Sequence, residues 1–342
     1  EALPIRDMAD LYSLQSGVVK VEAGTQGGIP DMEERGLVEV HVRGGRSGEI
    51  AYMIDGLYIR NPIFGGIGSG TRLNIFAIKE FDFQPGGFNA EYGDAMSAVS
   101  NMHTNRGGKE FQYKFKYETS LVGAALGSRF DELRGYDDYS LGFGGKIPFT
   151  EKFNYWVSGQ LTENDNSRVY DFDETTYIED DPGNNENRKN LTQPWDTEAG
   201  FRGFGFNNTW DVFGNLTFKA TNKLKFNMSY WRVAAHSKSF NATYMFWDDG
   251  QQELFKDTER FTIEVNHSLT QKMFYTFRAS RFIQDQFQGV RWQDSDSDEL
   301  PDWFEWSYAA GERQNPSGVQ ISDPYNPDVV PYTVSEDGKS VY

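Results

Sequence analysis

A run of acidic residues in the last quarter of the chain has the spacing of a metal-binding loop. Residues 294–305 read Asp-Ser-Asp-Ser-Asp-Glu-Leu-Pro-Asp-Trp-Phe-Glu. Side-chain oxygens fall at positions 1, 3, 5, 9 and 12 of this loop, and position 7 would give its backbone carbonyl. The candidate ligands are Asp294, Asp296, Asp298, Leu300, Asp302 and Glu305. Because calcium prefers six to eight hard oxygens, this spacing predicts a calcium loop.

One position argues against that prediction. Glu299 stands where calcium loops usually carry a glycine to make a sharp turn, and a non-glycine residue with positive φ is uncommon. The segment is similar to the calcium loops of dockerin and thrombospondin-type repeats, while the alternative interpretation is a solvated acidic loop. A bound calcium ion would stiffen the loop rather than catalyse a reaction. A weaker acidic run over residues 171–181 is interpreted as plain solvation.

No cluster of residues in the sequence predicts catalysis. The four histidines, His41, His103, His236 and His267, have no metal-ligand spacing. The sequence contains no nucleophile elbow, phosphate-binding loop or dinucleotide fingerprint. With a net charge of −18 and no basic stripe, it also lacks the means to neutralise phosphates. We therefore expect no enzymatic activity, no required cofactor and no nucleic-acid partner.

The composition restricts the class of protein. The 342 residues contain no cysteine and are 15% aromatic, but only 38% are hydrophobic. No stretch approaches the roughly 20 apolar residues of a transmembrane helix, which excludes a helical inner-membrane protein. The chain begins with Glu1 rather than Met, so we expect it to be processed or trimmed.

Seven stretches after Lys109 alternate apolar and polar residues with a period of two, which indicates β-strands. In the clearest, Leu224, Phe226, Met228 and Tyr230 share one face. The predicted strands lie within residues 111–117, 139–147, 153–161, 210–218, 224–230, 261–269 and 273–279.

The connections between these strands also alternate in length. Tight turns are predicted at 150–152, 221–223 and 270–272, and long connections at 127–136, 166–205, 238–256 and from 288 onward. Short turns on one side and long loops on the other are typical of an outer-membrane β-barrel, with the short turns in the periplasm. The acidic loop would then lie in the fourth external loop. A soluble sandwich with one buried face is the alternative.

Residues 1–108 form a small α+β unit rich in glycine. We expect a helix over residues 5–15, ended by Gly17, and a hairpin that turns at Asp55-Gly56. Short strands are predicted at 18–22, 37–42, 49–54, 57–59 and 78–83, with a helical turn at 73–75. The fold class is therefore mainly β, with this unit over 1–108 and the N-terminal part of a transmembrane barrel over 109–342.

Three motifs in order carry a family resemblance: Val40–Ser47, Tyr52–Tyr58 and Gly86–Thr104. They resemble the plug domain of TonB-dependent outer-membrane transporters, and the Gly-Gly-Arg-Ser form looks most like importers of Bacteroidota-type bacteria. The motif residues are Gly44, Gly45, Asp55, Gly56, Gly86, Gly87, Tyr92 and Gly93. Ala98 departs from the family, which usually has glycine there. The resemblance covers residues 1 to about 110, and the rest matches only as a barrel pattern.

The resemblance implies a mechanism and a location. Family plugs are held inside the barrel by charged pairs, which implies that Arg43 and Arg106 face glutamates of the wall. A packing or solubility role is the alternative for Arg43. Substrate would bind between the plug and the external loops, and a TonB-type coupling protein would supply energy across the periplasm. The location would be the outer membrane of a Gram-negative-type bacterium, with its lipid as a further partner. No TonB box is evident before Ile5, so we expect that element elsewhere.

Family barrels have 22 strands, and seven strands cannot close around a plug of about 100 residues. Open edges in lipid are also costly. We therefore expect the chain to be part of a longer protein.

One hypothesis is an importer of a scarce nutrient: a glycan, a peptide or a metal chelate. The second is a plugged barrel that acts as a scaffold or docks a surface lipoprotein. A soluble β-rich binding module is the third. The substrate cannot be predicted.

Overall fold

The computed structural model describes residues 8–21, 37–59, 67–93, 95–172, 200–242, 251–291 and 303–305. The described part before residue 109 contains one helix, three single-turn 3-10 helices and two small sheets. The helical segments are α1 (Met8–Ser13), η1 (Ser47–Glu49), η2 (Ser69–Thr71) and η3 (Ile75–Ala77). The three-stranded sheet has the order β1 (Val18–Val21), β2 (Leu37–Val42) and β5 (Ile67–Gly68). The four-stranded sheet has the order β4 (Leu57–Tyr58), β3 (Ile50–Ile54), β7 (Ala98–Thr104) and β6 (Ile78–Gln84). We call this part the N-terminal unit.

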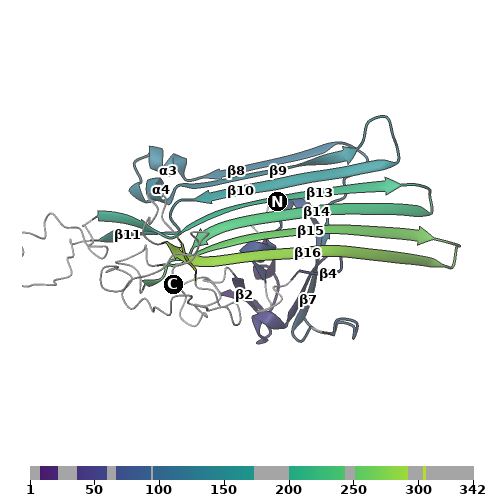
Figure 1. Ribbon diagram of the computed structural model, residues 1–342, viewed down its shortest axis with the longest axis horizontal. Coiled ribbons are helices and arrows are strands. Elements are labelled where there is room, and N and C mark those ends of the chain that lie inside the picture. The colour runs from purple at the N-terminus through teal and green to yellow at the C-terminus, as the bar shows by residue number, and fades with distance from the viewer. Residues whose placement is uncertain are drawn as a thin grey trace, which may run out of the picture.

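The rest of the described chain is dominated by one antiparallel sheet of eight strands, which we call the wall sheet (Figure 1). Its order is β17-β16-β15-β14-β13-β10-β9-β8. The strands are β8 (Gln112–Thr119), β9 (Tyr136–Lys146), β10 (Phe153–Asn164), β13 (Phe206–Lys219), β14 (Leu224–Lys238), β15 (Glu253–Ser268), β16 (Phe274–Arg291) and β17 (Trp303–Glu305). All seven predicted strands are confirmed, and most extend beyond the predicted bounds.

The tight turns share one local device. Each has the sequence Thr-x-Lys, and in each the threonine hydroxyl accepts a hydrogen bond from the lysine backbone N–H. The distances are 3.3 Å in 150–152, 3.1 Å in 221–223 and 3.3 Å in 270–272. A hydroxyl that bonds its own backbone two residues later favours a turn over a continued strand. These turns lie together at one end of the sheet, and the helical segment 121–134 and the strand pair 168–172 and 200–204 lie at the other end (Figure 1).

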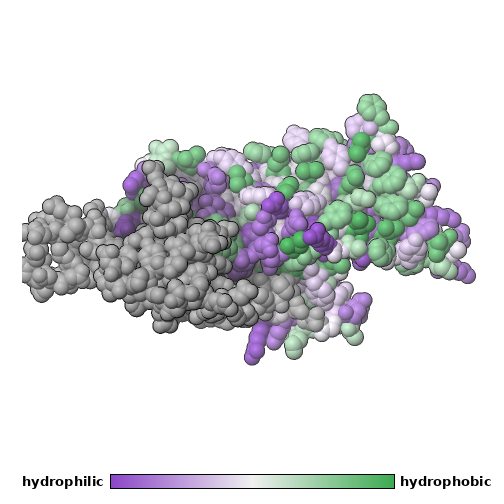
Figure 2. All heavy atoms as spheres, viewed as in Figure 1, coloured by the Kyte–Doolittle hydropathy of each residue, from purple (hydrophilic) through white to green (hydrophobic). Residues whose placement is uncertain are grey.

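The wall sheet exposes mainly apolar residues on one face and buries mainly polar residues on the other. On β13 the exposed residues include Trp210 and Leu216, whereas Asp211, Asn215 and Thr217 on the other face are at most 4% exposed. Figure 2 shows apolar side chains spread over the visible face of these strands. This polarity is the reverse of a soluble sheet, and it is the arrangement of a barrel strand with lipid on one side.

The N-terminal unit packs against the inner, polar face of the wall sheet (Figure 1). One buried cluster contains residues of both parts, including Tyr52 and Leu73 of the unit and Trp156, Phe213 and Trp231 of the wall. Contacts also join η2 to β14 and β15, and η3 to β9 and β10. The two parts therefore share a hydrophobic core.

Tyr12 anchors α1 to the N-terminal unit. Its side chain is fully buried, and its hydroxyl shares a 2.6 Å hydrogen bond with the Ser100 hydroxyl on β7. The ring meets those of Tyr52, Phe81 and Phe83 edge-on. Burial raises the pKa of the Tyr12 phenol well above its usual value, because the charged form would be desolvated.

Several elements differ from the sequence prediction. β7 is one of the two interior strands of its sheet and pairs in parallel with β3, although residues 98–104 were predicted only as part of a motif. The connection between β8 and β9, predicted at 127–136, runs from 120 to 135 and contains two short helices, α3 (Leu121–Ala125) and α4 (Arg129–Arg134). The second long connection contains a hairpin of β11 (Arg168–Phe172) and β12 (Gly200–Phe204), and β17 lies within the predicted fourth loop. No described helix has the length and hydropathy to span a membrane.

The inverted polarity predicts unequal losses of stability at two adjacent positions on β16. Phe277 is 57% exposed on the outer face, whereas Thr276 lies on the inner face and donates to Asn266 Oδ1 at 2.7 Å. Phe277→Lys would place a charge in lipid and should lower the free energy of unfolding by about 2–4 kcal/mol. Thr276→Lys removes only a hydrogen bond and should lower the free energy of unfolding by about 1 kcal/mol. Denaturant titration of the full-length protein in lipid vesicles measures both, and an equal or reversed ranking would contradict the assigned faces.

Candidate functional site

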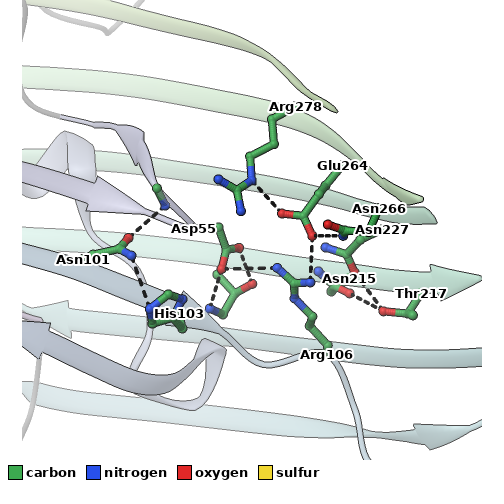
Figure 3. A network of polar contacts seen from close by, with 12 residues as sticks. Asp55, Asn101, His103, Arg106, Asn215, Thr217, Asn227, Glu264, Asn266 and Arg278 are labelled. Atoms are coloured by element: carbon green, nitrogen blue, oxygen red, sulfur yellow. Dashed lines mark hydrogen bonds and ion pairs between the residues drawn. The ribbon is translucent and has the colours of Figure 1, made fainter. Parts of the chain in front are cut away.

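A polar network joins the N-terminal unit to the inner face of the wall sheet (Figure 3). Arg106 lies two residues after the end of β7. Its Nη1 donates to Glu264 Oε1 on β15 at 3.0 Å, and its Nη2 lies 3.7 Å from Asp55 Oδ1. The Arg106 side chain is 28% exposed, while those of Glu264 and Asp55 are 5% and 11% exposed. One guanidinium therefore links a carboxylate of each part.

Glu264 is held by donors from both parts. Arg278 Nε on β16 donates to its Oε2 at 2.7 Å, and Asn266 Nδ2 donates to its Oε1 at 2.7 Å. With Arg106, three side chains thus donate to a single nearly buried carboxylate. Burying a carboxylate is costly unless it is paired and hydrogen-bonded, so this arrangement favours its ionised form.

Asp55 fixes the β3–β4 hairpin to β7. The predicted turn is confirmed, with φ of 50° at Asp55 and 76° at Gly56. The Asp55 carboxylate accepts hydrogen bonds from the Thr104 N–H at 3.0 Å and the Thr104 hydroxyl at 2.6 Å. The Gly56 N–H donates to Asn101 Oδ1 at 2.9 Å. A Cβ at Gly56 would lie 3.2 Å from Arg278 Nη1, so the turn lies close to the wall.

A second polar cluster, centred on Arg72, joins the two parts elsewhere on the wall. Arg72 Nη2 donates to the Thr162 hydroxyl at 2.7 Å. The guanidinium lies 3.7 Å from Asp138 on β9 and 3.6 Å from Asp211 on β13. Its backbone carbonyl accepts a hydrogen bond from Trp231 Nε1 at 2.9 Å. One cation of the N-terminal unit thus lies between two carboxylates of the wall.

The carboxylates of this cluster have further donors. Gln160 and Thr162 each donate to Asp138 Oδ2 at 2.6 Å. Both the backbone and the side-chain amide of Asn74 donate to Asp211 Oδ1. The two carboxylates are at most 3% exposed and share one arginine. Arg72 therefore offsets a repulsion that would otherwise be buried.

A small cavity of about 20 Å³ lies between the two polar clusters. Asp55, Ser229, Trp231, Arg260 and Thr262 contribute to its lining. Such a volume is enough for about one water molecule. Arg260 donates through Nε to Ser280 at 2.9 Å, and its Nη1 has no partner among the described residues. Asp55 and Arg260 thus line the same small cavity, together with the apolar side chains of Ile54, Leu73 and Phe213.

Arg43, the other predicted plug–barrel contact, is placed differently from Arg106. It has a φ of 50°, and its backbone N–H donates to the Gly17 carbonyl. A Cβ at Gly17 or at Gly86 would lie 3.5 Å from its side chain. Within the described ranges no ion pair joins Arg43 to the wall sheet. Its neighbours therefore belong to the N-terminal unit.

The predicted motif residues lie around turns of this unit. Gly44, Gly86 and Gly87 have positive φ, and a Cβ at Gly45 would lie 2.5 Å from the Ser97 Cβ. Tyr92 packs with residues of β3 and β7, and Gly93 follows it in the same loop. The structure brings Asp55 and Gly56 to the wall, whereas these other motif residues lie within the unit itself.

The predicted calcium loop cannot be placed. Asp294, Asp296, Asp298, Leu300 and Asp302 lie outside the described residues, and Glu305 is known only through its backbone in β17, where it pairs with Gly289. The division of the chain at residue 108 also stays a prediction. Among the residues described, no three acidic or histidine side chains cluster as metal ligands.

The sequence prediction missed Arg72, Asp138 and Asp211. The two aspartates do carry a signal, because they lie at inward positions of alternating strands, where a carboxylate needs a partner. Arg72 follows a glycine-rich stretch with no strand or helix pattern. Its partners Asp138 and Asp211 lie 66 and 139 residues later in the sequence. Such pairing has no local signature.

Comparison with known proteins identifies the fold of this chain. No family model matches the sequence, and no curated protein matches it. Among solved structures, the ferric yersiniabactin uptake receptor FyuA from Yersinia pestis has a TM-score of 0.54 at 11% identity, over 84% of this chain and 39% of that one. FpvA of P. aeruginosa, bound to heterologous pyoverdines, has a TM-score of 0.56 at 10% identity, over 88% of this chain and 35% of that one. The siderophore receptor PiuA from Acinetobacter baumannii has a TM-score of 0.52 at 12% identity, over 84% of this chain and 35% of that one.

The fold is that of a TonB-dependent receptor: a plug domain followed by antiparallel transmembrane β-barrel strands. The N-terminal unit corresponds to the plug, and the wall sheet to part of the barrel. The chain spans between 35% and 39% of the length of these structures. At such low identity the likeness concerns the fold alone.

The first prediction for the site concerns Arg106 and Glu264. Arg106→Gln should lower the free energy of unfolding by about 1–3 kcal/mol, because a nearly buried carboxylate loses a charged donor. In a double-mutant cycle with Glu264→Gln, the coupling energy should be about 1–3 kcal/mol. The exposed pair Arg129–Glu132, more than half exposed on both sides, should show no measurable coupling. Zero coupling between Arg106 and Glu264 would contradict the network.

The second prediction concerns Arg72. Arg72→Gln leaves Asp138 and Asp211 buried without their cation, which should cost roughly 3–5 kcal/mol. Amide exchange of residues 73–77, measured by mass spectrometry, should accelerate in this variant. Adding Asp211→Asn should restore slow exchange, because it removes the uncompensated charge. If Asp211→Asn gives no rescue, the two carboxylates are not what Arg72 stabilises.

Proposed function

We propose that the protein is a TonB-dependent transporter in the outer membrane of a Gram-negative-type bacterium. It takes up a scarce nutrient into the periplasm, and a TonB-type protein supplies the energy. The observation that carries this proposal is the position of Arg106, which links Asp55 of the plug to Glu264 of the wall.

A transporter of this kind needs a plug that is held firmly yet released repeatedly. Ion pairs and hydrogen bonds suit that role, because their groups can exchange partners for water when the plug moves. Both the Arg106 and the Arg72 contacts join side chains of the plug to side chains of the wall. Release would hydrate these groups rather than expose only apolar surface, which lowers its cost.

The nutrient is proposed only as a class: a glycan, a peptide or a metal chelate. The similar structures include a ferric yersiniabactin uptake receptor, a siderophore receptor and FpvA bound to heterologous pyoverdines. Ferric chelates are therefore the first compounds to try.

The alternative is a plugged barrel that serves as a scaffold or docks a surface lipoprotein. The shared hydrophobic core favours it, since Trp156, Phe213 and Trp231 of the wall are at most 3% exposed against the plug. Separating such a core exposes apolar surface to water and opposes movement. The two functions differ in whether the plug moves in energised cells.

A cysteine at Ser100 reports plug movement. Ser100 is fully buried on β7 and bonded to Tyr12, so Ser100→Cys should react with a maleimide dye only when the plug opens. In cells grown in rich medium, which supplies peptides, glycans and metal chelates together, labelling should rise severalfold over cells treated with a proton uncoupler. Glu132→Cys on α4, an exposed position, is the matched control and should label equally in both.

Equal labelling of Ser100→Cys with and without the proton gradient would favour the scaffold. Loss of the difference in a strain without TonB would support energy coupling through that protein. A difference that persists without TonB would contradict the proposed partner.

A further inference from the structure

The helical pair α3–α4 exposes an apolar run that the proposed transport does not use. Residues 121–126 read Leu-Val-Gly-Ala-Ala-Leu, without a polar side chain. Leu121, Val122 and Leu126 are 59%, 65% and 84% exposed, and Phe130 on α4 is 44% exposed. Exposed apolar residues in one short run mark an interaction surface.

This surface is held in a defined shape. The Ser128 hydroxyl accepts a hydrogen bond from the Asp131 N–H at the start of α4, and Gly135 ends that helix with a φ of 52°. Asn166 Nδ2 donates to the Leu133 carbonyl at 2.6 Å, which ties α4 to the loop after β10. A Cβ at Gly123 would clash with Asp131, so the two helices approach closely. The exposed side chains therefore project from a fixed support.

The apolar run continues the lipid-facing side of the wall sheet. Tyr117 on β8 and Tyr139 on β9 stack with ring centroids 4.6 Å apart, and each is about 40% exposed on the outer face. The Tyr117 hydroxyl donates to Asp137 Oδ1 at 2.8 Å. Aromatic rings with their hydroxyls toward polar groups are typical of the membrane interface.

The distance from this ring pair to α3 is short. The ladder between β8 and β9 closes with the Ser120 N–H donating to the Tyr136 carbonyl, and the Thr119 hydroxyl accepts from the Leu121 N–H. Leu121 follows Tyr117 by four residues, so their Cα atoms lie within roughly 14 Å of each other. Figure 2 shows apolar side chains over α3 as well as over β8 and β9.

We propose that α3–α4 lies on the membrane, with Leu121, Val122 and Leu126 among the outer-leaflet lipids. The absence of any charge on α3 fits lipid better than a protein partner, whose interface would carry a polar rim. Arg129 and Glu132 of α4 form an exposed ion pair at 2.7 Å, which suits the side of the element that faces water. The element anchors the first external loop at the barrel's edge.

Spin labels measure the depth of this surface directly. Val122→Cys and Leu126→Cys are made singly in the full-length protein, in a background without other cysteines, and carry a nitroxide. The labelled protein is reconstituted in vesicles of phosphatidylcholine and phosphatidylglycerol. Heat-modifiability on a gel shows that each variant is folded. Collision rates with oxygen, which enters lipid, and with a nickel chelate, which stays in water, are then compared.

Two matched sites calibrate the result. Phe115→Cys, 67% exposed on the outer face of β8, represents lipid, and Glu132→Cys represents water. At residues 122 and 126 the ratio of oxygen to nickel collisions should resemble that at residue 115 and exceed that at 132 severalfold. A ratio equal to that at residue 132 would overturn the proposal. Low collision rates with both reagents would also overturn it, because they would mean that protein covers the surface.

Discussion

Every other feature of this structure depends on the inverted polarity of the wall sheet. Strands that present apolar residues to lipid must point their polar residues inward, and inward groups that are buried need hydrogen-bond partners. On β13 the inward residues include Asp211, Asn215 and Thr217, all nearly inaccessible to solvent. The plug covers much of this face. The stability of the plug and that of the wall therefore depend on each other. The wall supplies buried carboxylates, and the plug supplies the arginines that offset their charge.

The interface combines two kinds of contact with different consequences. The shared hydrophobic core fixes the position of the plug, because removing Trp231 or Phe213 from contact would expose apolar area. The Arg106 and Arg72 clusters fix its orientation, because hydrogen bonds to carboxylates are directional. The two clusters lie on either side of the small cavity that Asp55 and Arg260 line. An interface of this composition is specific, and its polar groups suit the plug movement that the proposed transport requires.

The sequence predicts what is encoded locally. A period of two in residues 224–230 is enough to find β14, and the Thr-x-Lys turns and the Asp55-Gly56 hairpin follow from local backbone chemistry. The β7 strand was missed because Ala98–Thr104 pairs in parallel with β3, about 48 residues earlier. Parallel strands are not joined by a tight turn, so the sequence near β7 contains no turn signal for this pairing. The β11–β12 hairpin was missed for a similar reason, since 27 residues separate its strands: 173 to 199. Arg72 has wall partners only through tertiary structure, whereas Arg106 was expected only through a family resemblance.

The central claim is that the plug docks on the inner face of the wall in the described register, and a disulfide tests it most directly. A Cβ at Gly70 in η2 would lie 3.3 Å from the Thr258 hydroxyl oxygen on β15, so cysteines at the two positions would bring their sulfurs within reach of each other. The same Cβ would lie 2.6 Å from Gln284 Nε2 and 2.9 Å from Lys256 Cδ, which are parts of flexible side chains that can move aside. In the full-length protein, Gly70→Cys with Thr258→Cys should form the bond nearly completely under mild oxidation. Gly87→Cys with Thr258→Cys is the control, because a Cβ at Gly87 meets nothing within 4 Å. Failure of the first pair to cross-link, or equal cross-linking of the control, would contradict the account.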